Sequence, residues 1–246
     1  MQSRRKFMLG LVACPLCASA AKAEGAHWSY EGNSKPENWA KLDAKFKVCA
    51  VGTEQSPVNL SGAVTAQPDN LALKWSSEPF QVINNGHTIQ ANTGGTNTLD
   101  LDGKSYSLKQ FHFHAPSEHA LDNKRSAMEV HFVHAAADGG LTVVGVFMKV
   151  GKANAAFRDV MANAPAKEGE SKTKTTIDPN VMLPEKRGHF RYEGSLTTPP
   201  CSEIVNWVVM ENPIEVAEAD VAAFVKLFPN NARPLQALNR RFLLIR

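Results

Sequence analysis

The segment Gln110-Phe111-His112-Phe113-His114 alternates polar with aromatic side chains, which is typical of a β-strand with one buried aromatic face. Successive side chains of a strand point to opposite faces, so His112 and His114 share a face with Cα atoms about 6.6 Å apart. Two imidazoles at this spacing can bind one metal ion. The longer stretch 104–114 predicts a strand that places Tyr106, Leu108, Gln110, His112 and His114 on one face and Phe111 and Phe113 on the other.

A third histidine lies in a second alternating stretch, residues 128–134, which contains Glu129-Val130-His131-Phe132-Val133. If this stretch forms a neighbouring antiparallel strand, His131 comes to lie beside the first two histidines. Three protein ligands leave the fourth tetrahedral position of zinc open for water, as in catalytic rather than structural zinc sites. A His-x-His pair on a strand also occurs without metal, so the spacing alone leaves a metal-free strand open.

Two polar residues strengthen the metal hypothesis. Gln110 precedes His112 by two positions and Glu129 precedes His131 by two, so each shares a strand face with its histidine. Each can accept a hydrogen bond from the ring nitrogen that does not bind metal, which fixes the tautomer and orientation of the ring. The sequence therefore predicts a pair of acceptor–histidine units around one ion.

The rest of the chain predicts one β-rich domain without internal repeats. Its 246 residues are 43% hydrophobic and 21% charged, an ordinary globular composition. Apolar runs predict strands at 141–150 and 204–210, and an Asn85-Gly86 turn pair predicts a hairpin within 80–89. Helical spacing of apolar residues predicts short helices at 157–164 and 221–228, each ended by a proline. The polar stretch 167–176 is expected to be a surface loop.

The N-terminus predicts an export signal. Arg4, Arg5 and Lys6 precede an apolar run over 7–16, and Ala21-Lys22-Ala23 fits a cleavage site. We therefore expect a signal peptide at 1–23, a mature domain at 24–246 and a periplasmic protein. The paired arginines resemble a twin-arginine signal, with an ordinary secretory signal as the alternative. The run is too short to span a bilayer, and no membrane anchor is expected.

Charge and cysteine usage agree with export. Four of the 27 basic residues and none of the 24 acidic residues lie in 1–23, so the remaining chain is nearly neutral. No basic field indicates binding to nucleic acid. Only Cys49 and Cys201 lie outside the signal, and an even pair in an oxidising compartment predicts a disulfide. Two buried free thiols are the alternative.

Several further motifs follow one another along the chain. They are His27-Trp28-Ser29-Tyr30-Glu31-Gly32, Gln55-Ser56-Pro57-Val58-Asn59-Leu60, Asn84-Asn85-Gly86-His87, Phe111-His112-Phe113-His114, Ser117-Glu118-His119, Glu129-Val130-His131-Phe132-Val133-His134, Tyr192-Glu193-Gly194-Ser195-Leu196-Thr197-Thr198-Pro199-Pro200 and Asn231-Ala232-Arg233-Pro234. In content and order they resemble the α-class carbonic anhydrases, in the bacterial exported form, over nearly all of 27–246.

The resemblance implies a mainly β (α+β) fold. Its form is a single domain on a large twisted, mostly antiparallel sheet of about ten strands with short surface helices. It also implies reversible hydration of carbon dioxide to bicarbonate and a proton by zinc-bound hydroxide, with Zn²⁺ held by His112, His114 and His131. Sulfonamides and anions are the inhibitors that the resemblance implies.

The resemblance also implies roles for further residues. Thr197 orients the nucleophile and passes a hydrogen bond to Glu118, and His87 is the proton shuttle. The carbon dioxide pocket is formed by Val133, Val143, Leu196, Val205, Trp207 and Thr198. The waters of the proton relay are held by Tyr30, Asn85, Gln90 and Tyr192. His119 and His134 match structural histidines.

Two departures and two alternatives remain. Only Ala115-Pro116 separates His114 from Ser117, a shorter connection than in animal relatives, which is expected to widen one side of the cleft. Gln90 stands where an asparagine is common. One alternative function is a non-catalytic binding module of the same fold. Another is a zinc-dependent esterase, although the chain has no His-Glu-x-x-His helix motif.

Overall fold

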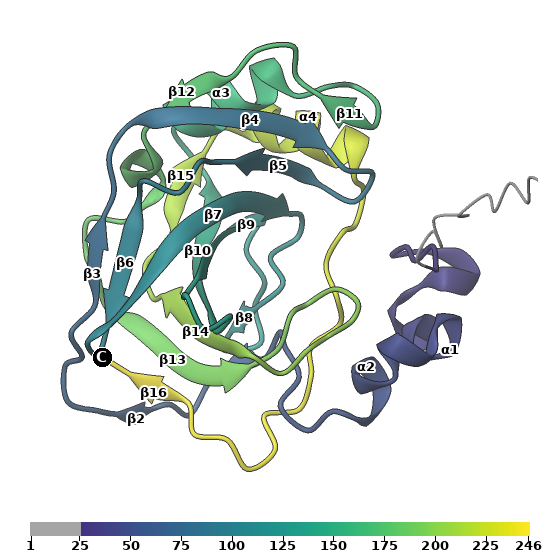
Figure 1. Ribbon diagram of the computed structural model, residues 1–246, viewed down its shortest axis with the longest axis vertical. Helices are drawn as coiled ribbons and strands as arrows, with labels where there is room; N and C mark the ends of the chain where they lie inside the picture. The colour runs from purple at the N-terminus through teal and green to yellow at the C-terminus, as the bar shows by residue number, and fades with distance from the viewer. Residues whose placement is uncertain (1–25) are drawn as a thin grey trace, which may run out of the picture.

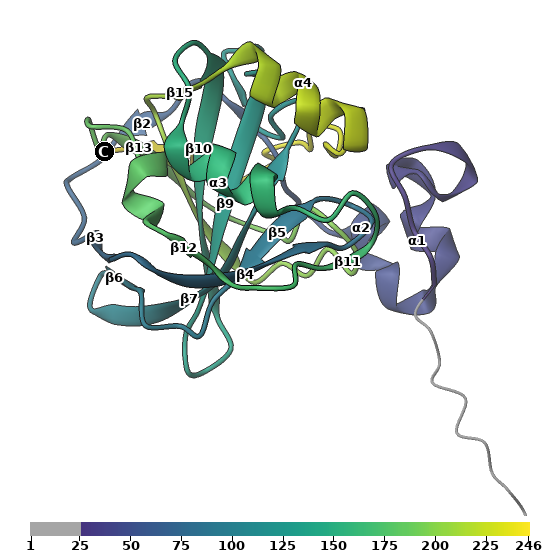
Figure 2. The same ribbon diagram turned by 90° about the horizontal axis from the view of Figure 1, so that it is seen from above.

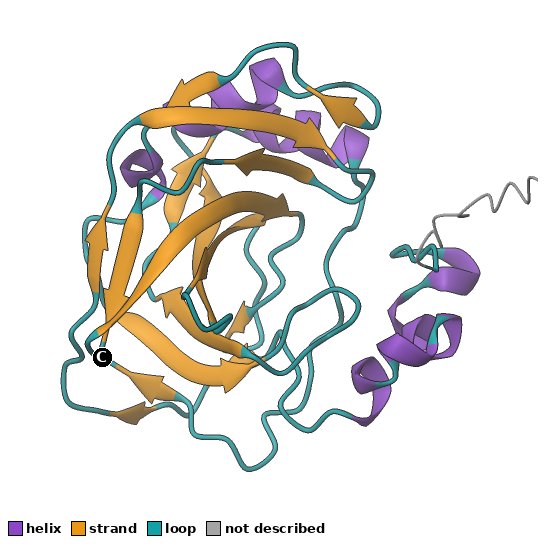
Figure 3. Ribbon diagram, in the orientation of Figure 1, coloured by secondary structure: helices purple, strands orange, loops and turns teal. Residues whose placement is uncertain are grey.

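The computed structural model describes residues 26–246, and the predicted signal peptide at 1–23 lies outside them. Figures 1 and 3 show a strongly curved sheet with few helices. The strands are β1 (Asn59–Leu60), β2 (Val64–Thr65), β3 (Ala72–Lys74), β4 (Glu78–Asn84), β5 (Ile89–Asn92), β6 (Thr98–Leu101), β7 (Lys104–His114), β8 (Ala120–Leu121), β9 (Met128–Ala135), β10 (Leu141–Val150), β11 (Gly169–Glu170), β12 (Thr175–Ile177), β13 (His189–Gly194), β14 (Val205–Met210), β15 (Ile214–Val216) and β16 (Leu244–Ile245). The helices are α1 (Trp39–Leu42), α2 (Val48–Val51), α3 (Ala155–Asn163) and α4 (Glu218–Leu227), with 3₁₀ turns at Gly32–Ser34, Pro36–Asn38, Ala44–Phe46 and Pro179–Met182.

Fourteen of the described strands form one sheet, whose main path of ten runs β11-β4-β5-β7-β9-β10-β14-β13-β16-β2. Most neighbours are antiparallel, and the parallel pairs are β10 with β14, β10 with β15, and β16 with β2. The predicted fold class is confirmed: a mainly β domain on a large, mostly antiparallel sheet. Among the helices within residues 26–246, none is long and apolar enough to cross a membrane.

The two faces of the sheet have different roles. One face carries the larger apolar core and is covered by α3 and α4, which lie side by side in Figure 2. Phe113 of β7 packs against both helices, with ring centroids 4.8 Å from Phe157 and 6.2 Å from Phe224. Asn154 caps α3 by accepting a hydrogen bond from the backbone N–H of Phe157. Both helices were predicted from their apolar spacing. The opposite face carries the predicted histidines together with a smaller apolar cluster.

The predicted alternation along β7 is correct only for its second half. A β-bulge shifts the pairing of β7 with β9 between Leu108 and Gln110. An extra residue reverses the faces of the side chains that precede it. Tyr106 and Leu108 therefore pack in the same core cluster as Phe111, and not on the face of the histidines as predicted. The bulge leaves Gln110, His112 and His114 on one face, as the site requires.

The expected surface loop at 167–176 is also partly wrong. Within it, β11 pairs with β4 at Gly169 and Asn84, and β12 pairs with β4 at Thr175 and Phe80. Strands of two and three residues are too short for an apolar alternation to be detected in the sequence. The segment therefore protects the open edge of β4.

The N-terminal segment of the described chain is fastened to the domain by a disulfide. Cys49, in α2, is bonded to Cys201 with Cα atoms 5.0 Å apart, which confirms the predicted pair. Figure 1 shows α1 and α2 beside the sheet rather than on its helix-covered face. The short helices of this segment were not predicted, since four residues are too few for an apolar period to emerge.

Candidate metal centre

The three predicted histidines converge in space. His112 of β7 pairs directly with His131 of β9, and His114 lies two residues along β7 on the same face. The ring centroids are 5.0 Å apart for His112 and His114, 5.4 Å for His112 and His131, and 4.6 Å for His114 and His131. One ring nitrogen from each of the three lies within 4.8 Å of the others, which is close enough to share one ion.

The remaining nitrogen of each ring is held by a protein oxygen. Nδ1 of His112 is 2.8 Å from Oε1 of Gln110, and Nε2 of His131 is 2.9 Å from Oε1 of Glu129. The third acceptor is the backbone oxygen of Asn231, 2.7 Å from Nδ1 of His114. These contacts leave Nε2 of His112, Nε2 of His114 and Nδ1 of His131 available to a metal ion, and they fix the orientation of each ring.

The surroundings shift the pKa values of the three histidines in different directions. Burial, followed by the charges of the neighbouring histidines, holds the pKa of His112 well below its usual value, and burial also lowers the pKa of His114. Burial acts in the same direction on His131, but the Glu129 carboxylate outweighs it and raises the pKa of His131. A metal ion requires neutral imidazoles, and the site already favours them at the first two positions.

Two unpartnered polar atoms test whether a cation fits. Nε2 of His114 and Oε2 of Glu118 are buried, and neither has a hydrogen-bond partner among the described residues. The two atoms are 3.4 Å apart, and Oε2 of Glu118 is 3.8 Å from Nδ1 of His131. Buried polar groups without partners are costly, so their concentration here points to a group that binds them. Three imidazoles and an open fourth position suit Zn²⁺.

A second group of possible ligands, His119, Glu129 and His131, is already satisfied internally. Oε1 of Glu129 is 2.7 Å from Nδ1 of His119 and 2.9 Å from Nε2 of His131, while Oε2 accepts a bond from the backbone N–H of His119. Both histidines keep the pKa of Glu129 well below its usual value, against the opposing effect of burial. The carboxylate is therefore an acceptor that holds the ring of His131, a candidate metal ligand.

Glu118 and Thr197 are the pair that the resemblance implies for orienting the nucleophile. Both are buried, and Oε1 of Glu118 accepts a bond of 2.8 Å from the backbone N–H of Arg233. No hydrogen bond between Thr197 and Glu118 is present among the described residues, and Oε2 of Glu118 remains available as an acceptor. The adjacent Thr198 accepts a bond of 2.9 Å from the backbone N–H of Cys201 through its own carbonyl, which anchors this turn beside the disulfide.

The predicted apolar wall is one contiguous cluster on the histidine face. Val133, Val143 and Trp207 lie side by side across β9, β10 and β14, because Val143 pairs with each of the other two. Val205 pairs with Leu141 one step along the same strands. Of the apolar residues predicted for the carbon dioxide pocket, Val143, Val205 and Trp207 belong to the smaller core cluster, and the partly buried Val133 and Leu196 pack against it.

His87 lies at the turn between β4 and β5, stacked on Trp28 with ring centroids 3.8 Å apart and planes 8° apart. Its ring is half-buried, and burial lowers its pKa, with His27 adding to the effect. Asn85 shapes the turn by accepting bonds from the backbone N–H groups of His87 and Thr88. The resemblance did not single out Trp28 as a partner of His87.

The residues predicted to hold the relay waters lie in different surroundings. Gln90 pairs with His112 across β5 and β7, and its Oε1 accepts a bond of 3.3 Å from Asn85. Burial, followed by the charge of Glu118, raises the pKa of Tyr30 well above its usual value. Tyr192 differs from the prediction: its hydroxyl is bonded to His119 and Ser56, both buried, and is not free for relay waters.

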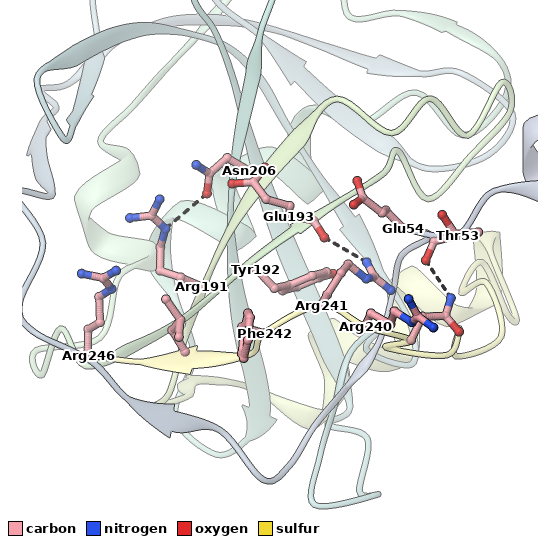
Figure 4. A pocket seen from close by; sticks show the side chains of 12 residues that line it. Thr53, Glu54, Arg191, Tyr192, Glu193, Asn206, Arg240, Arg241, Phe242 and Arg246 are labelled. Carbon is pink, nitrogen blue, oxygen red and sulfur yellow. Dashed lines mark hydrogen bonds between the residues drawn. The ribbon is translucent and has the colours of Figure 1, made fainter.

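A separate cavity of about 710 Å³ lies on the outer side of β13. Figure 4 shows several arginines in its wall. Arg191 is engaged by Asn206, Asp69 and Asp102, and Arg241 donates to four backbone carbonyls. The histidine ligands do not line this cavity, so its size gives no reason to place the chemistry there.

Sequence reasoning missed three supports of the centre. The acceptor for His114 is the carbonyl of Asn231, which no side-chain pattern can reveal. Arg233 fixes Glu118 through its backbone N–H, and the motif around 231–234 was the only signal of either. His119 was interpreted as structural, and the structure shows that it shares the carboxylate of Glu129 with the candidate ligand His131.

Comparisons with known proteins identify the family. The family model for eukaryotic-type carbonic anhydrase matches residues 34–245. A carbonic anhydrase of Pectobacterium carotovorum is 41% identical over 231 residues, covering 93% of this chain and 95% of the relative. A carbonic anhydrase of Neisseria gonorrhoeae is 36% identical, covering 95% and 94%.

A solved structure gives the same result in three dimensions. The α-carbonic anhydrase of Thermovibrio ammonificans, in complex with the inhibitor sulfanilamide, superposes with a TM-score of 0.87 at 43% identity. The superposition covers 90% of this chain and 100% of that one. Family and fold together support carbonic anhydrase activity, the hydration of carbon dioxide. This chain belongs to the α-carbonic anhydrase family.

Proposed function

We propose that this chain catalyses the zinc-dependent, reversible hydration of carbon dioxide to bicarbonate and a proton at the His112, His114 and His131 centre. The observation that carries the proposal is the arrangement of the six ring nitrogens. One nitrogen of each ring faces a common point, and the other is held by Gln110, Asn231 or Glu129. In a cluster with only a structural role, three neighbouring ring nitrogens without hydrogen-bond partners would be unfavourable.

The bound Zn²⁺ would lower the pKa of a coordinated water to about 7, a value established for carbonic anhydrases themselves, and so supply a nucleophile at neutral pH. The chain's own residues prepare the approach of carbon dioxide. Val133, Val143 and Trp207 present apolar surface on the histidine face, where a small apolar substrate displaces water at little cost.

Glu118 and Thr197 orient the reacting oxygen in this proposal. A carboxylate without a proton can only accept, so a hydroxyl that donates to Glu118 must accept from its other neighbour. Oε1 of Glu118 is occupied by the Arg233 N–H, and the free Oε2 is the acceptor that the Thr197 hydroxyl needs. Anions that cannot donate a hydrogen bond to Thr197 are disfavoured by the same arrangement.

His87 carries the released proton from the site to the solvent. An imidazole titrates near neutral pH and can accept and release a proton in each cycle. His87 is half-buried at the turn before β5, the strand whose Gln90 pairs with the ligand His112. Waters held by polar side chains between the metal centre and His87, Asn85 and Gln90 among them, would form the proton path.

Sulfonamide and anion inhibition belong to the same proposal. The Thermovibrio ammonificans relative was solved in complex with the inhibitor sulfanilamide, and three histidine ligands in this chain would leave the fourth position of zinc open to such an inhibitor. Bound inhibitor would compete with the nucleophile for the ion.

We also propose that the mature protein is periplasmic, because residues 1–23 carry the features of an export signal.

Stopped-flow hydration of carbon dioxide tests the function. The mature protein is expected to contain about one zinc per chain, to lose activity on prolonged chelation and to regain it with Zn²⁺. His112→Ala should lose both metal and activity. His27→Ala, at an exposed position, should retain the metal.

Each alternative predicts a different result. Full hydration activity in metal-free protein would contradict the proposed zinc chemistry. Zinc binding without hydration would favour a binding module of the same fold, and turnover of activated esters alone would favour an esterase.

A further inference from the structure

We infer that Tyr192 is a positioning residue for the metal centre, acting through His119 and Glu129 on the ligand His131. The inference rests on the proposed zinc site and extends it to a residue that touches neither metal nor substrate. It replaces the predicted role of Tyr192 at the relay waters, because its hydroxyl is fully engaged elsewhere.

The first step of the argument is the shared carboxylate. Glu129 is completely buried and, as an acceptor only, takes bonds from His131 Nε2, His119 Nδ1 and the His119 backbone N–H. The orientation of the His131 ring therefore depends on where this carboxylate is held. His119 provides two of its three bonds and so largely determines that position.

The second step concerns the His119 ring, which is itself completely buried. One nitrogen is bonded to Glu129, and the other lies 2.6 Å from the Tyr192 hydroxyl. The ring is thus fixed from both sides. Without the hydroxyl, a buried nitrogen would lose its partner, and the ring would be held on one side alone.

The third step shows that Tyr192 is itself anchored. Its hydroxyl is 3.0 Å from Oγ of Ser56, and Ser56 and Ser195 bond each other twice, Ser195 N to Ser56 Oγ and Ser56 N to Ser195 Oγ. Ser195 precedes Leu196 and Thr197. One continuous chain of buried hydrogen bonds therefore joins a metal ligand to the turn that carries the proposed orienting threonine.

The geometry of the ring makes the hydroxyl separable from packing. The Tyr192 ring lies parallel to Trp207, with planes 5° apart and centroids 6.2 Å apart, and Arg241 lies 5.5 Å from the Tyr192 centroid on the cavity side. Phenylalanine preserves these contacts and removes only the hydroxyl. Tyr106 provides a matched control: it is a buried tyrosine near the start of β7, far along the strand from His112 and His114, and it is not part of this chain of hydrogen bonds.

The test measures zinc release from the holoenzyme into an excess of chelator. Tyr192→Phe is expected to release zinc about 3- to 10-fold faster than the wild type, a smaller effect than the 10- to 100-fold typical of groups bonded directly to ligands. Substitution of the zinc by Co²⁺ should also give an altered visible spectrum in Tyr192→Phe. Tyr106→Phe should match the wild type in both measurements.

A double mutant tests the route. Because both residues act in one chain, Tyr192→Phe should add no further acceleration in a Glu129→Gln background. An unchanged release rate and Co²⁺ spectrum in Tyr192→Phe, with or without a lower melting temperature, overturns the inference. A full additional effect in the Glu129→Gln background also overturns it. A wild type that binds no zinc would instead defeat the proposed function, so the two failures are distinguishable.

Discussion

A Cβ atom at Gly145 would lie 2.8 Å from Oε1 of Glu129, closer than real Cβ contacts allow. Gly145 pairs with His131 across β9 and β10, on the face where the Glu129 carboxylate lies. The missing side chain therefore makes room for the carboxylate that holds His131, one of the proposed metal ligands. Its backbone φ is not in the left-handed region, so space rather than conformation accounts for the glycine.

Gly145→Ala should consequently weaken zinc binding. The added methyl group must displace the carboxylate from His131 and His119, and we expect about 10-fold faster zinc release into chelator. Gly94→Ala is the control, because its Cβ would meet no atom within 4 Å. Equal release rates in the two variants would mean that Glu129 can shift without consequence for His131.

The proton-shuttle role of His87 predicts a specific kinetic pattern. Its loss should lower kcat but spare kcat/KM, since the proton leaves after bicarbonate has departed. Imidazole buffer should restore the rate of His87→Ala. Thr197→Ala should instead depress kcat/KM, because it acts on the nucleophile. A fall in kcat/KM without imidazole rescue would make His87 structural, held by its stack on Trp28.

His134 should make the metal-free protein sensitive to acid. Burial lowers its pKa from 6.5 to about 4, so between these values the unfolded chain binds more protons than the folded one. Stability contributed by the neutral ring is complete above pH 6.5 and falls by about 3 kcal/mol as the pH approaches 4. Urea unfolding at several pH values measures how the free energy of unfolding depends on pH. Between pH 6.5 and 4 this dependence should be weaker in His134→Leu than in the wild type, and an equal dependence would contradict the lowered pKa of His134.

The disulfide should contribute substantially to stability. The bridge joins residues 152 positions apart, and the chain-entropy model gives about 5 kcal/mol for a loop of this length, as an upper figure. A Cys49→Ser, Cys201→Ser double variant should therefore unfold at lower urea than the wild type. Native mass spectrometry after alkylation should find no free thiol at either position, and two modified cysteines in oxidising buffer would contradict the bridge.

Export by the twin-arginine route predicts dependence on both arginines. Arg4→Lys combined with Arg5→Lys should prevent export, because the route recognises the pair, and sequencing of mature protein should begin at Glu24. Cell fractionation with an activity or antibody readout provides the measurement. Undiminished export of the double variant would indicate the general secretory route.

The central strands were accessible to sequence reasoning because each strand there repeats every two residues. This period and one pairing bring His112, His114 and His131 together, but only the family resemblance favoured a metal site over a metal-free strand. Tyr106 was misplaced because a bulge breaks the period without leaving a signature in residue type. The carbonyl of Asn231 was invisible, since every residue carries a carbonyl and only tertiary structure selects one.

Tyr192 shows a different limit. The sequence motif around Tyr192 indicated that the residue lies near the site. Which residues its hydroxyl contacts, however, depends on how β13 pairs with its neighbouring strands. In the structure the hydroxyl lies between His119 and Ser56, residues 73 and 136 positions away in the chain. Contacts of that range are specified by the register of whole strands, which a single motif does not contain.

The pairing of β16 with β2 and β13 has a consequence for biosynthesis. Leu244 lies between Val64 on one side and Arg191 on the other, so this border of the sheet joins an early segment to a very late one. While the ribosome still holds the last strand in its exit tunnel, β2 has no partner, and the sheet cannot close around β13. Completion of the fold must therefore follow release of β16 from the tunnel, and until then the nascent chain exposes an open sheet border that chaperones or neighbouring nascent chains can bind.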